Sequence, residues 1–314
     1  MLLLILTLIF GIGAAVIRGY QLTESFHPYT SLIEPGDKFT ILLMVISVAF
    51  AVIAGAYLFM RRKKLAQITP PDGDTVLDTV RLIIQTIAPI PLAIASVYEL
   101  FEGFDGVSWG DIFSANSGVR WSLVCLGLLG LLSTVALLMV STNIRLRHSA
   151  MGFWATVPVF WSCLMLVVGF WGQSGVPVRN SFVYGMLASA LCTLALYSFA
   201  GFFFGRAKPA KALFYATTGV FFSILTLGGF LFAQTLGTPF HELTTTVMLR
   251  HAFIILHLSA FSIAILQGRP ASFEVAVPDT TSETEEVPDT EEATDAPSET
   301  IPETGDTPSE PNAE

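Results

Sequence analysis

Eight long apolar segments dominate the first 270 residues of this chain. They lie at about 2–17, 39–60, 80–99, 121–141, 151–172, 181–204, 212–233 and 247–266. Most exceed the roughly 18 residues needed to cross the hydrocarbon core of a bilayer. Backbone groups in lipid must be hydrogen-bonded within the segment itself, which favours a helix for each. The sequence therefore predicts an all-α fold, a polytopic membrane bundle of eight transmembrane helices.

The composition excludes several classes of protein. Only 13% of the residues are charged, whereas soluble domains carry about 25%, so a soluble enzyme is disfavoured. A net charge of −9 without a basic stripe also excludes nucleic acid as a partner, because phosphate would be repelled. The expected partner is the lipid bilayer.

The acidic residues are concentrated at the C-terminal end. Residues 271–314 hold 14 of the 25 acidic residues and no Lys or Arg, and Asp, Glu, Thr, Ser, Pro and Ala make up most of them. Such a segment has too little apolar surface to offset the entropy lost on ordering. We expect a transmembrane domain at 1–270 and a disordered acidic cytoplasmic tail at 271–314, which either stays solvated or binds a basic protein partner.

The basic residues predict the orientation. Lys and Arg alternate between rich and poor connections, as the positive-inside rule requires. Ten lie on one side: Arg61, Arg62, Lys63, Lys64, Arg145, Arg147, Arg206, Lys208, Lys211 and Arg269. The opposite side has five: Arg18, Lys38, Arg120, Arg179 and Arg250. This alternation predicts a multi-pass plasma-membrane protein with both termini in the cytoplasm. The first segment lacks a basic start, which disfavours a cleaved signal peptide.

Ionisable residues within apolar segments are the first pointers to function. His257 lies near the centre of the eighth segment, and Arg250 lies seven residues earlier on the same helical face. One interpretation is a proton-responsive or ligand-contacting histidine. The other is a neutral histidine bonded to a neighbouring hydroxyl, with Ser223 and Thr226 at similar depth.

The third segment is the other unusual one. Arg81 and Gln85 are four residues apart near its start, and Pro89 and Pro91 follow near its middle. Each proline removes a backbone donor. Broken helices at mid-membrane form substrate sites in many transporters, but prolines also produce simple kinks. Both interpretations stay open.

Other signals are weaker. Gly127 and Gly130, and the pairs Gly185/Ser189 and Gly201/Gly205, have spacings that let helices approach closely. The three cysteines form no CxxC motif, so no disulfide or metal site is expected. Catalytic residues are not apparent, since HExxH, G-x-S-x-G and P-loop motifs are absent. No pair of carboxylates lies within the apolar segments, which argues against carboxylate-coupled ion transport.

Two stretches carry a family resemblance. The first contains Arg18-Gly19-Tyr20-Gln21-Leu22, Phe26, Thr30, Leu32 and Pro35-Gly36-Asp37, and the second runs from Phe199-Ala200-Gly201 to Gly205-Arg206. Across residues 1–270 the chain resembles uncharacterised multi-pass membrane proteins of Gram-positive anaerobic bacteria. The resemblance implies no activity, no cofactor and no site residues.

Three classes of function remain. A solute permease or an accessory transport subunit is favoured by the prolines of the third segment and by His257. A membrane scaffold or signalling partner is favoured by the acidic tail. An intramembrane enzyme is the least supported. A polar cavity between the third and eighth segments would favour transport, and a solid apolar bundle would favour the scaffold.

Overall fold

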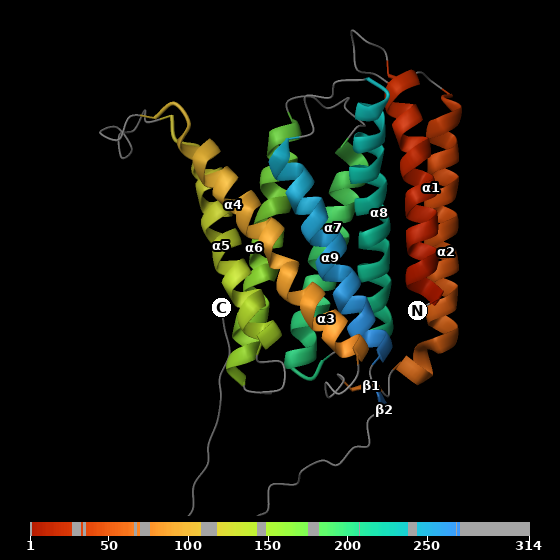
Figure 1. Ribbon diagram of the computed structural model, residues 1–314, viewed down its shortest axis with the longest axis vertical. Coiled ribbons are helices and arrows are strands. Elements are labelled where there is room, and N and C mark those ends of the chain that lie inside the picture. Colours follow the sequence, from red (N-terminus) through yellow and green to blue (C-terminus); the bar gives the residue numbers. More distant parts are fainter. Residues whose placement is uncertain are drawn as a thin grey trace, which may run out of the picture. The chain divides into compact units, whose positions relative to one another are not determined.

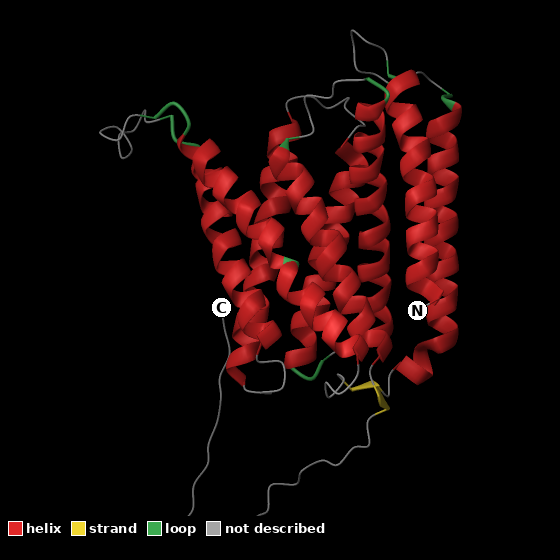
Figure 2. Cartoon of the chain, in the orientation of Figure 1, coloured by secondary structure: helices red, strands yellow, loops and turns green. Residues whose placement is uncertain are grey.

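The computed structural model describes residues 2–26, 33, 36–65, 68–69, 76–107, 118–142, 149–174, 182–206, 208–237, 244–267 and 269–270. Within these ranges the chain is almost entirely helical (Figures 1 and 2). The helices are α1 (Leu2–Glu24), α2 (Lys38–Leu65), α3 (Val76–Ile87), α4 (Pro89–Phe104), α5 (Trp121–Thr142), α6 (Ser149–Ser174), α7 (Val183–Phe203), α8 (Pro209–Thr235) and α9 (Thr245–Gln267). Helices α3 and α4 share one span, so eight spans are long and apolar enough to cross a membrane. The predicted all-α membrane bundle is confirmed.

The spans alternate in direction along the chain. In Figure 1, α1 rises, α2 descends, and the alternation continues until α9 descends. The upper end of the bundle therefore holds the last residues of α1, α4, α6 and α8. The lower end holds the last residues of α2, α5, α7 and α9, together with the start of α1.

Helix α8 is the most enclosed span. In its most apolar window 67% of the residues are buried, compared with 28% for α2. It packs against α1, α2, α7 and α9. Consecutive helices from α4 to α9 pack against one another, and α9 returns to α4. The α1–α2 hairpin packs on the side of α8, outside this closed arrangement of six helices.

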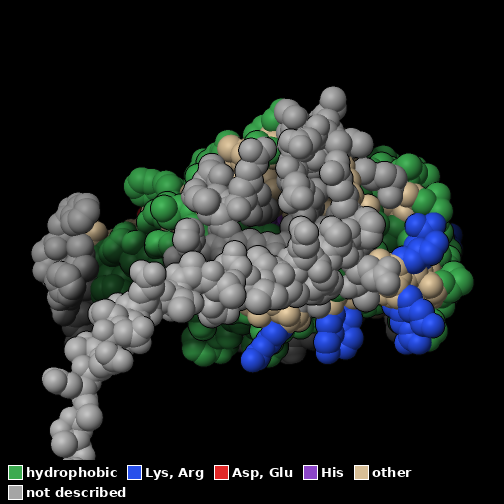
Figure 3. Space-filling view, turned by 90° about the horizontal axis from the view of Figure 1, so that it is seen from below, with side chains coloured by type: hydrophobic (Ala, Val, Ile, Leu, Met, Phe, Trp, Pro, Cys, Tyr) green, Lys and Arg blue, Asp and Glu red, His purple; other side chains and the backbone are tan. Residues whose placement is uncertain are grey.

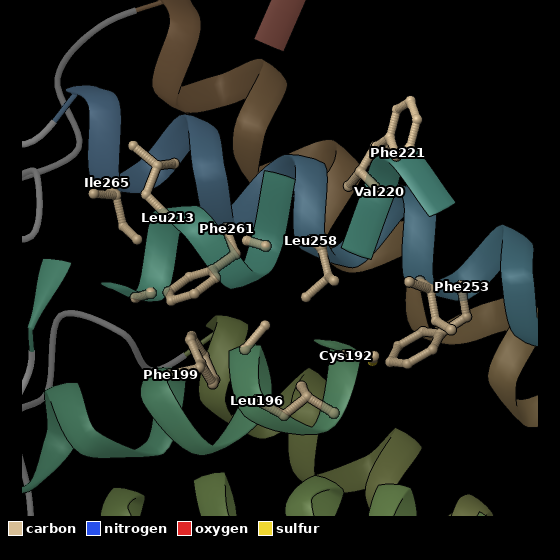
Figure 4. Packing of buried hydrophobic residues seen from close by; sticks show 14 of the residues in the cluster. Cys192, Leu196, Phe199, Leu213, Val220, Phe221, Phe253, Leu258, Phe261 and Ile265 are labelled. Atoms are coloured by element: carbon tan, nitrogen blue, oxygen red, sulfur yellow. The ribbon is translucent and has the colours of Figure 1, made fainter. Parts of the chain in front are cut away.

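The apolar core includes residues of all eight spans, and a large part of it lies between α7, α8 and α9. Figure 4 shows its buried side chains, which include Leu196 and Phe199 from α7, Leu213 from α8 and Phe261 from α9. Phe199 and Phe261 meet edge to face, with ring centroids 5.2 Å apart. This is the arrangement that aromatic rings prefer.

The first helix is longer than its apolar segment predicts. Helix α1 continues from residue 17 to Glu24, and it buries Arg18 and Gln21 within the bundle. Hydropathy alone ends the segment at Arg18, because it cannot foresee that the polar side chains find partners there. The structure also contains a two-residue antiparallel pairing that the sequence did not predict. Strand β1 (Ile68–Thr69) follows α2 and pairs with β2 (Arg269–Pro270) after α9.

The chain divides into two units, Met1–Ala271 and Ser272–Glu314. All the helices that the structure describes belong to the first unit. The predicted acidic tail lies outside the described residues.

Small residues bring α4 and α5 together. A Cβ atom added to Gly127 of α5 would lie 2.7 Å from the carbonyl oxygen of Ser96 in α4, and 2.7 Å from Cγ of Leu100. A Cβ atom at Gly130 would lie 2.1 Å from Oγ of Ser96. The close contact between these helices therefore requires glycine at position 127, where the obstructing atom belongs to the backbone, whereas a side chain at position 130 would displace that of Ser96.

We expect Gly127→Ala to destabilise the protein by about 1–3 kcal/mol, the usual cost of overpacking. The obstructing atom is a backbone oxygen, which cannot rotate away. Gly13→Ala is the matched control, because no atom lies within 4 Å of the added Cβ. Thermal unfolding in detergent measures both, and equal midpoints for the two variants would contradict the α4–α5 packing.

Candidate functional site

A buried ion pair joins α4 to α9. Nε of Arg250 lies 2.8 Å and Nη2 lies 2.6 Å from Oε1 of Glu99. The side chain of Glu99 is 1% exposed and that of Arg250 is 16% exposed. Each residue lies five positions inside the upper end of its helix, which is about 8 Å at 1.5 Å per residue. Both charges are therefore withdrawn into the bundle.

A second ion pair at this end, between Glu102 of α4 and the residue that precedes α5, is exposed. Arg120 Nη1 lies 3.1 Å from Oε1 of Glu102, and these side chains are 54% and 49% exposed. Water screens such a pair, which contributes little to stability. Only one of the two pairs at this end is thus enclosed, among the residues that the structure describes.

A small pocket lies on the other side of Arg250. It has a volume of about 110 Å³ and lies between α6, α7, α8 and α9. Its polar lining comes from Arg250, His251, Ser189 and Thr226. The rest of the lining is apolar or glycine: Met165, Gly169, Phe182, Gly185, Met186, Phe230, Val247 and Ile254.

His251 is held at this pocket from one side. Its Nδ1 atom lies 3.5 Å from the Oγ atom of Ser223 in α8. Its Nε2 atom faces Gly185 of α7, where a Cβ atom added to the glycine would come within 3.4 Å of it. No described residue pairs with Nε2. His251, with this nitrogen unpaired, and Arg250 are thus adjacent residues of α9 that both line the pocket.

Two lining hydroxyls are already hydrogen-bonded. Ser189 donates to the carbonyl oxygen of Gly185 at 2.9 Å, and Thr226 donates to that of Phe222 at 2.8 Å. Each hydroxyl oxygen can still accept a hydrogen bond. The lining thus combines groups that suit a small polar solute.

His257 lies deeper and is surrounded by aromatic rings. It is 2% exposed. Its ring stacks on Phe253 with centroids 5.4 Å apart, and meets the edge of Phe199 at 5.7 Å. Neither ring nitrogen has a hydrogen-bond partner among the described residues. His257 is not among the residues that line the pocket.

The hydrogen bond expected between His257 and Ser223 or Thr226 does not form. Helices α8 and α9 run antiparallel, and Ser223 lies level with His251. His257 is six residues further down α9, about 9 Å away along the axis. The prediction failed because hydropathy does not give the register between two helices.

Of the residues singled out in the third span, Gln85, Pro89 and Pro91 do not line the pocket. Ala88 keeps helical angles, with φ −54° and ψ −37°, between α3 and α4. Pro89 and Pro91 therefore start α4 with a helical backbone on both sides. Gln85 is buried, and its Oε1 atom has no partner among the described residues. Arg81 lies on α3, and its side chain is outside the described part of the chain.

A second polar cluster joins α1 to the start of α2. The guanidinium of Arg18 donates to the side chain of Gln21, which donates to Thr40. Arg18 also lies 5.0 Å from the ring centroid of Tyr184 in α7, a distance typical of cation–π contacts.

Asp37 completes this cluster as the N-cap of α2. Its carboxylate accepts hydrogen bonds from the backbone N–H of Thr40 and from the Ser25 hydroxyl, both at 2.7 Å. Burial alone raises the pKa of Asp37, but these hydrogen bonds outweigh it, so the pKa lies below its ordinary 3.8. The cluster is a helix-capping arrangement.

The sequence interpretation missed Glu99 and His251. Glu99 ends the third apolar segment and is followed by Glu102 and Asp105, so it looks like part of a polar loop. Its buried neighbours on α4 are small, with Ala95 and Ser96 one turn earlier and Gly103 one turn later. A carboxylate on a stripe of small residues is the signal that would have placed Glu99 inside the bundle.

Neither a second hollow nor a metal-binding cluster adds to this candidate site. A hollow of about 420 Å³ runs along α4 at Ala93, Ile94, Val97, Tyr98 and Phe101. It is apolar and comes from one helix, as expected of a surface facing lipid. Among the described residues, no group of three His, Cys, Asp or Glu side chains is placed to hold a metal.

Comparison with protein-family models, with curated proteins and with solved structures finds no match to this chain. With eight spans long and apolar enough to cross a membrane, the chain is a multi-pass integral membrane protein.

We predict that Arg250→Ala destabilises the protein by about 3–5 kcal/mol, because it leaves the Glu99 carboxylate buried without its partner. Arg120→Ala, at the exposed pair, should cost at most about 1 kcal/mol. Adding Glu99→Gln to Arg250→Ala should recover part of the loss. Chemical unfolding in detergent measures all three, and equal losses for the two arginine variants would contradict the buried pair.

Proposed function

We propose that this protein binds a small polar solute within the membrane, as a solute permease or an accessory transport subunit. The observation that supports the proposal best is the pocket at Arg250 and His251, lined by four different spans. Ionisable groups inside a membrane are costly and are characteristic of substrate or ion pathways.

The proposed binding pocket is not in the place that the sequence analysis considered, between the third and eighth spans. There, α4 and α9 are joined by the Glu99–Arg250 pair. Space next to Arg250 lies instead toward α6, α7 and α8. At about 110 Å³ the pocket is smaller than the 300–1,000 Å³ usual for drug-sized ligands. The solute therefore has only a few non-hydrogen atoms.

Binding can be tested on the purified chain in detergent with acetate and acetamide, which share a shape but differ in charge. We expect at least one of them to raise the thermal midpoint. Ser189→Leu, which fills the pocket, should weaken that binding at least tenfold, equal to 1.4 kcal/mol. Ser198→Leu, on the opposite face of α7, should leave that binding unchanged. Equal binding by the two leucine variants would contradict the location of the site.

We further propose that the lower end faces the cytoplasm, which places both termini there in a bacterial plasma membrane. Figure 3 views the bundle from this end and shows Lys and Arg side chains along it. The described basic residues at this end are Arg61, Arg62, Lys63, Lys64, Arg206, Lys208 and Lys211. All described acidic side chains, by contrast, belong to the upper half: Glu24, Asp37, Glu99, Glu102 and Asp105. This asymmetry agrees with the positive-inside rule.

Cysteine labelling of intact cells tests the orientation. The background should lack Cys125, Cys163 and Cys192. Lys63→Cys is then expected to be protected from a membrane-impermeant reagent, whereas Asp105→Cys should react. Reaction at position 63 in intact cells would reverse the proposed topology.

A scaffold or signalling role remains the second candidate, supported by the 14 acidic residues of 271–314. We treat 1–270 as the transmembrane domain and 271–314 as a separate acidic tail that would bind a protein partner. Truncation after Pro270 separates the two functions, because solute binding at the pocket should survive it. The resemblance to multi-pass proteins of Gram-positive anaerobes adds no activity to either candidate.

A further inference from the structure

We infer that the pocket at Arg250 takes up a small monoanion together with one proton, and that Glu99 holds the proton. The inference rests on the proposed binding of a solute at this pocket. It adds the class of solute, an anion of about the size of acetate, and the ion that accompanies it.

Arg250 is placed to serve two acceptors. A guanidinium has five N–H bonds in a fixed fork. Nε and Nη2 point to the same carboxylate oxygen, Oε1 of Glu99, and the residue also lines the pocket. No other described residue accepts a hydrogen bond from this side chain. The remaining N–H groups have no partner among the described residues, and we infer that they serve a solute in the pocket that Arg250 lines.

Charge determines what can bind there. Without solute, the carboxylate of Glu99 balances the guanidinium of Arg250. An entering anion would place two negative charges beside one positive charge, at an ion pair whose side chains are 1% and 16% exposed. Like charges that lie close together repel one another strongly where little water is present to screen them. A proton on Glu99 removes this repulsion, because the anion then balances Arg250.

The proton has a definite atom to bind. Oε2 of Glu99 is buried and has no hydrogen-bond partner among the described residues. Protonation there converts the carboxylate to a neutral carboxyl group, and Oε1 keeps its contact with Arg250. The site is neutral before uptake, when it holds the Glu99 carboxylate and Arg250, and neutral after it, when it holds uncharged Glu99, Arg250 and the anion.

The other titratable groups around Glu99 are few. On α4 itself, Glu102 is paired with Arg120 at the exposed edge. Helix α5 contributes Cys125, and α9 contributes His251 and His257 besides Arg250. Asp78 and Arg81 belong to α3; Arg81 is 18 residues before Glu99 in the same span, about 27 Å along the axis. His251 is therefore the main competitor for the proton.

The test measures acetate binding by the full-length protein in detergent between about pH 6 and 8. If binding takes up one proton, the apparent affinity for acetate should rise about tenfold for each unit that the pH falls. Acetamide should show no such slope. In wild-type protein at low buffer strength, a pH-indicator dye should report about one proton taken up per acetate bound.

Variants identify the residue that takes the proton. Glu99→Gln should remove the pH slope and hold the affinity near its low-pH value, whereas Glu102→Gln should keep the slope. His251→Gln should also keep the slope, although its affinity is lower. A flat pH profile in the wild type, or a slope that is lost with His251→Gln and kept with Glu99→Gln, would overturn the inference. Failure of acetate and acetamide to bind at any pH would instead overturn the proposed function.

Discussion

The energetic cost of placing a charge away from water governs the upper half of this bundle. Glu99 and Arg250 each lie about 8 Å inside the end of a helix, where neither charge is stable alone. Their contact at 2.6 Å fixes the rotation of α4 against α9. A buried pair gains little net stability over apolar residues of similar volume, which is why we propose a role beyond folding for this one.

The other helices pack closely, and several of their buried hydroxyls donate hydrogen bonds to the backbone of their own helix. Gly127 and Gly130 allow α5 to approach the backbone of α4 below Glu99. Buried hydroxyls on α8 donate to their own helix, as Thr217 does to the carbonyl oxygen of Leu213 at 2.8 Å. Arg250 and His251 are the ionisable residues that line the pocket, and we propose that they contact the solute. The apolar core of α7, α8 and α9 fills the space below them.

The number and type of spans could be predicted from hydropathy, because a bilayer requires long apolar helices. The site was predicted in part. Arg250 was singled out as an ionisable residue, but its partner lies 151 positions earlier, and no local pattern encodes that pairing. His257 stood out because of its depth, yet its ring packs against Phe253 and Phe199. Depth follows from the sequence, whereas rotation and register depend on how neighbouring side chains pack.

The central claim is that Glu99 changes protonation when the pocket fills, and infrared difference spectroscopy tests it most directly. Acetate added to the wild-type protein should produce the carbonyl stretching band of a protonated carboxylic acid in a non-aqueous environment, and ¹³C-labelled acetate should leave that band unshifted. The band should be missing from Glu99→Gln and present in Glu102→Gln. Saturating acetate that produces no such band in the wild type, or a band that persists in Glu99→Gln, would contradict the account.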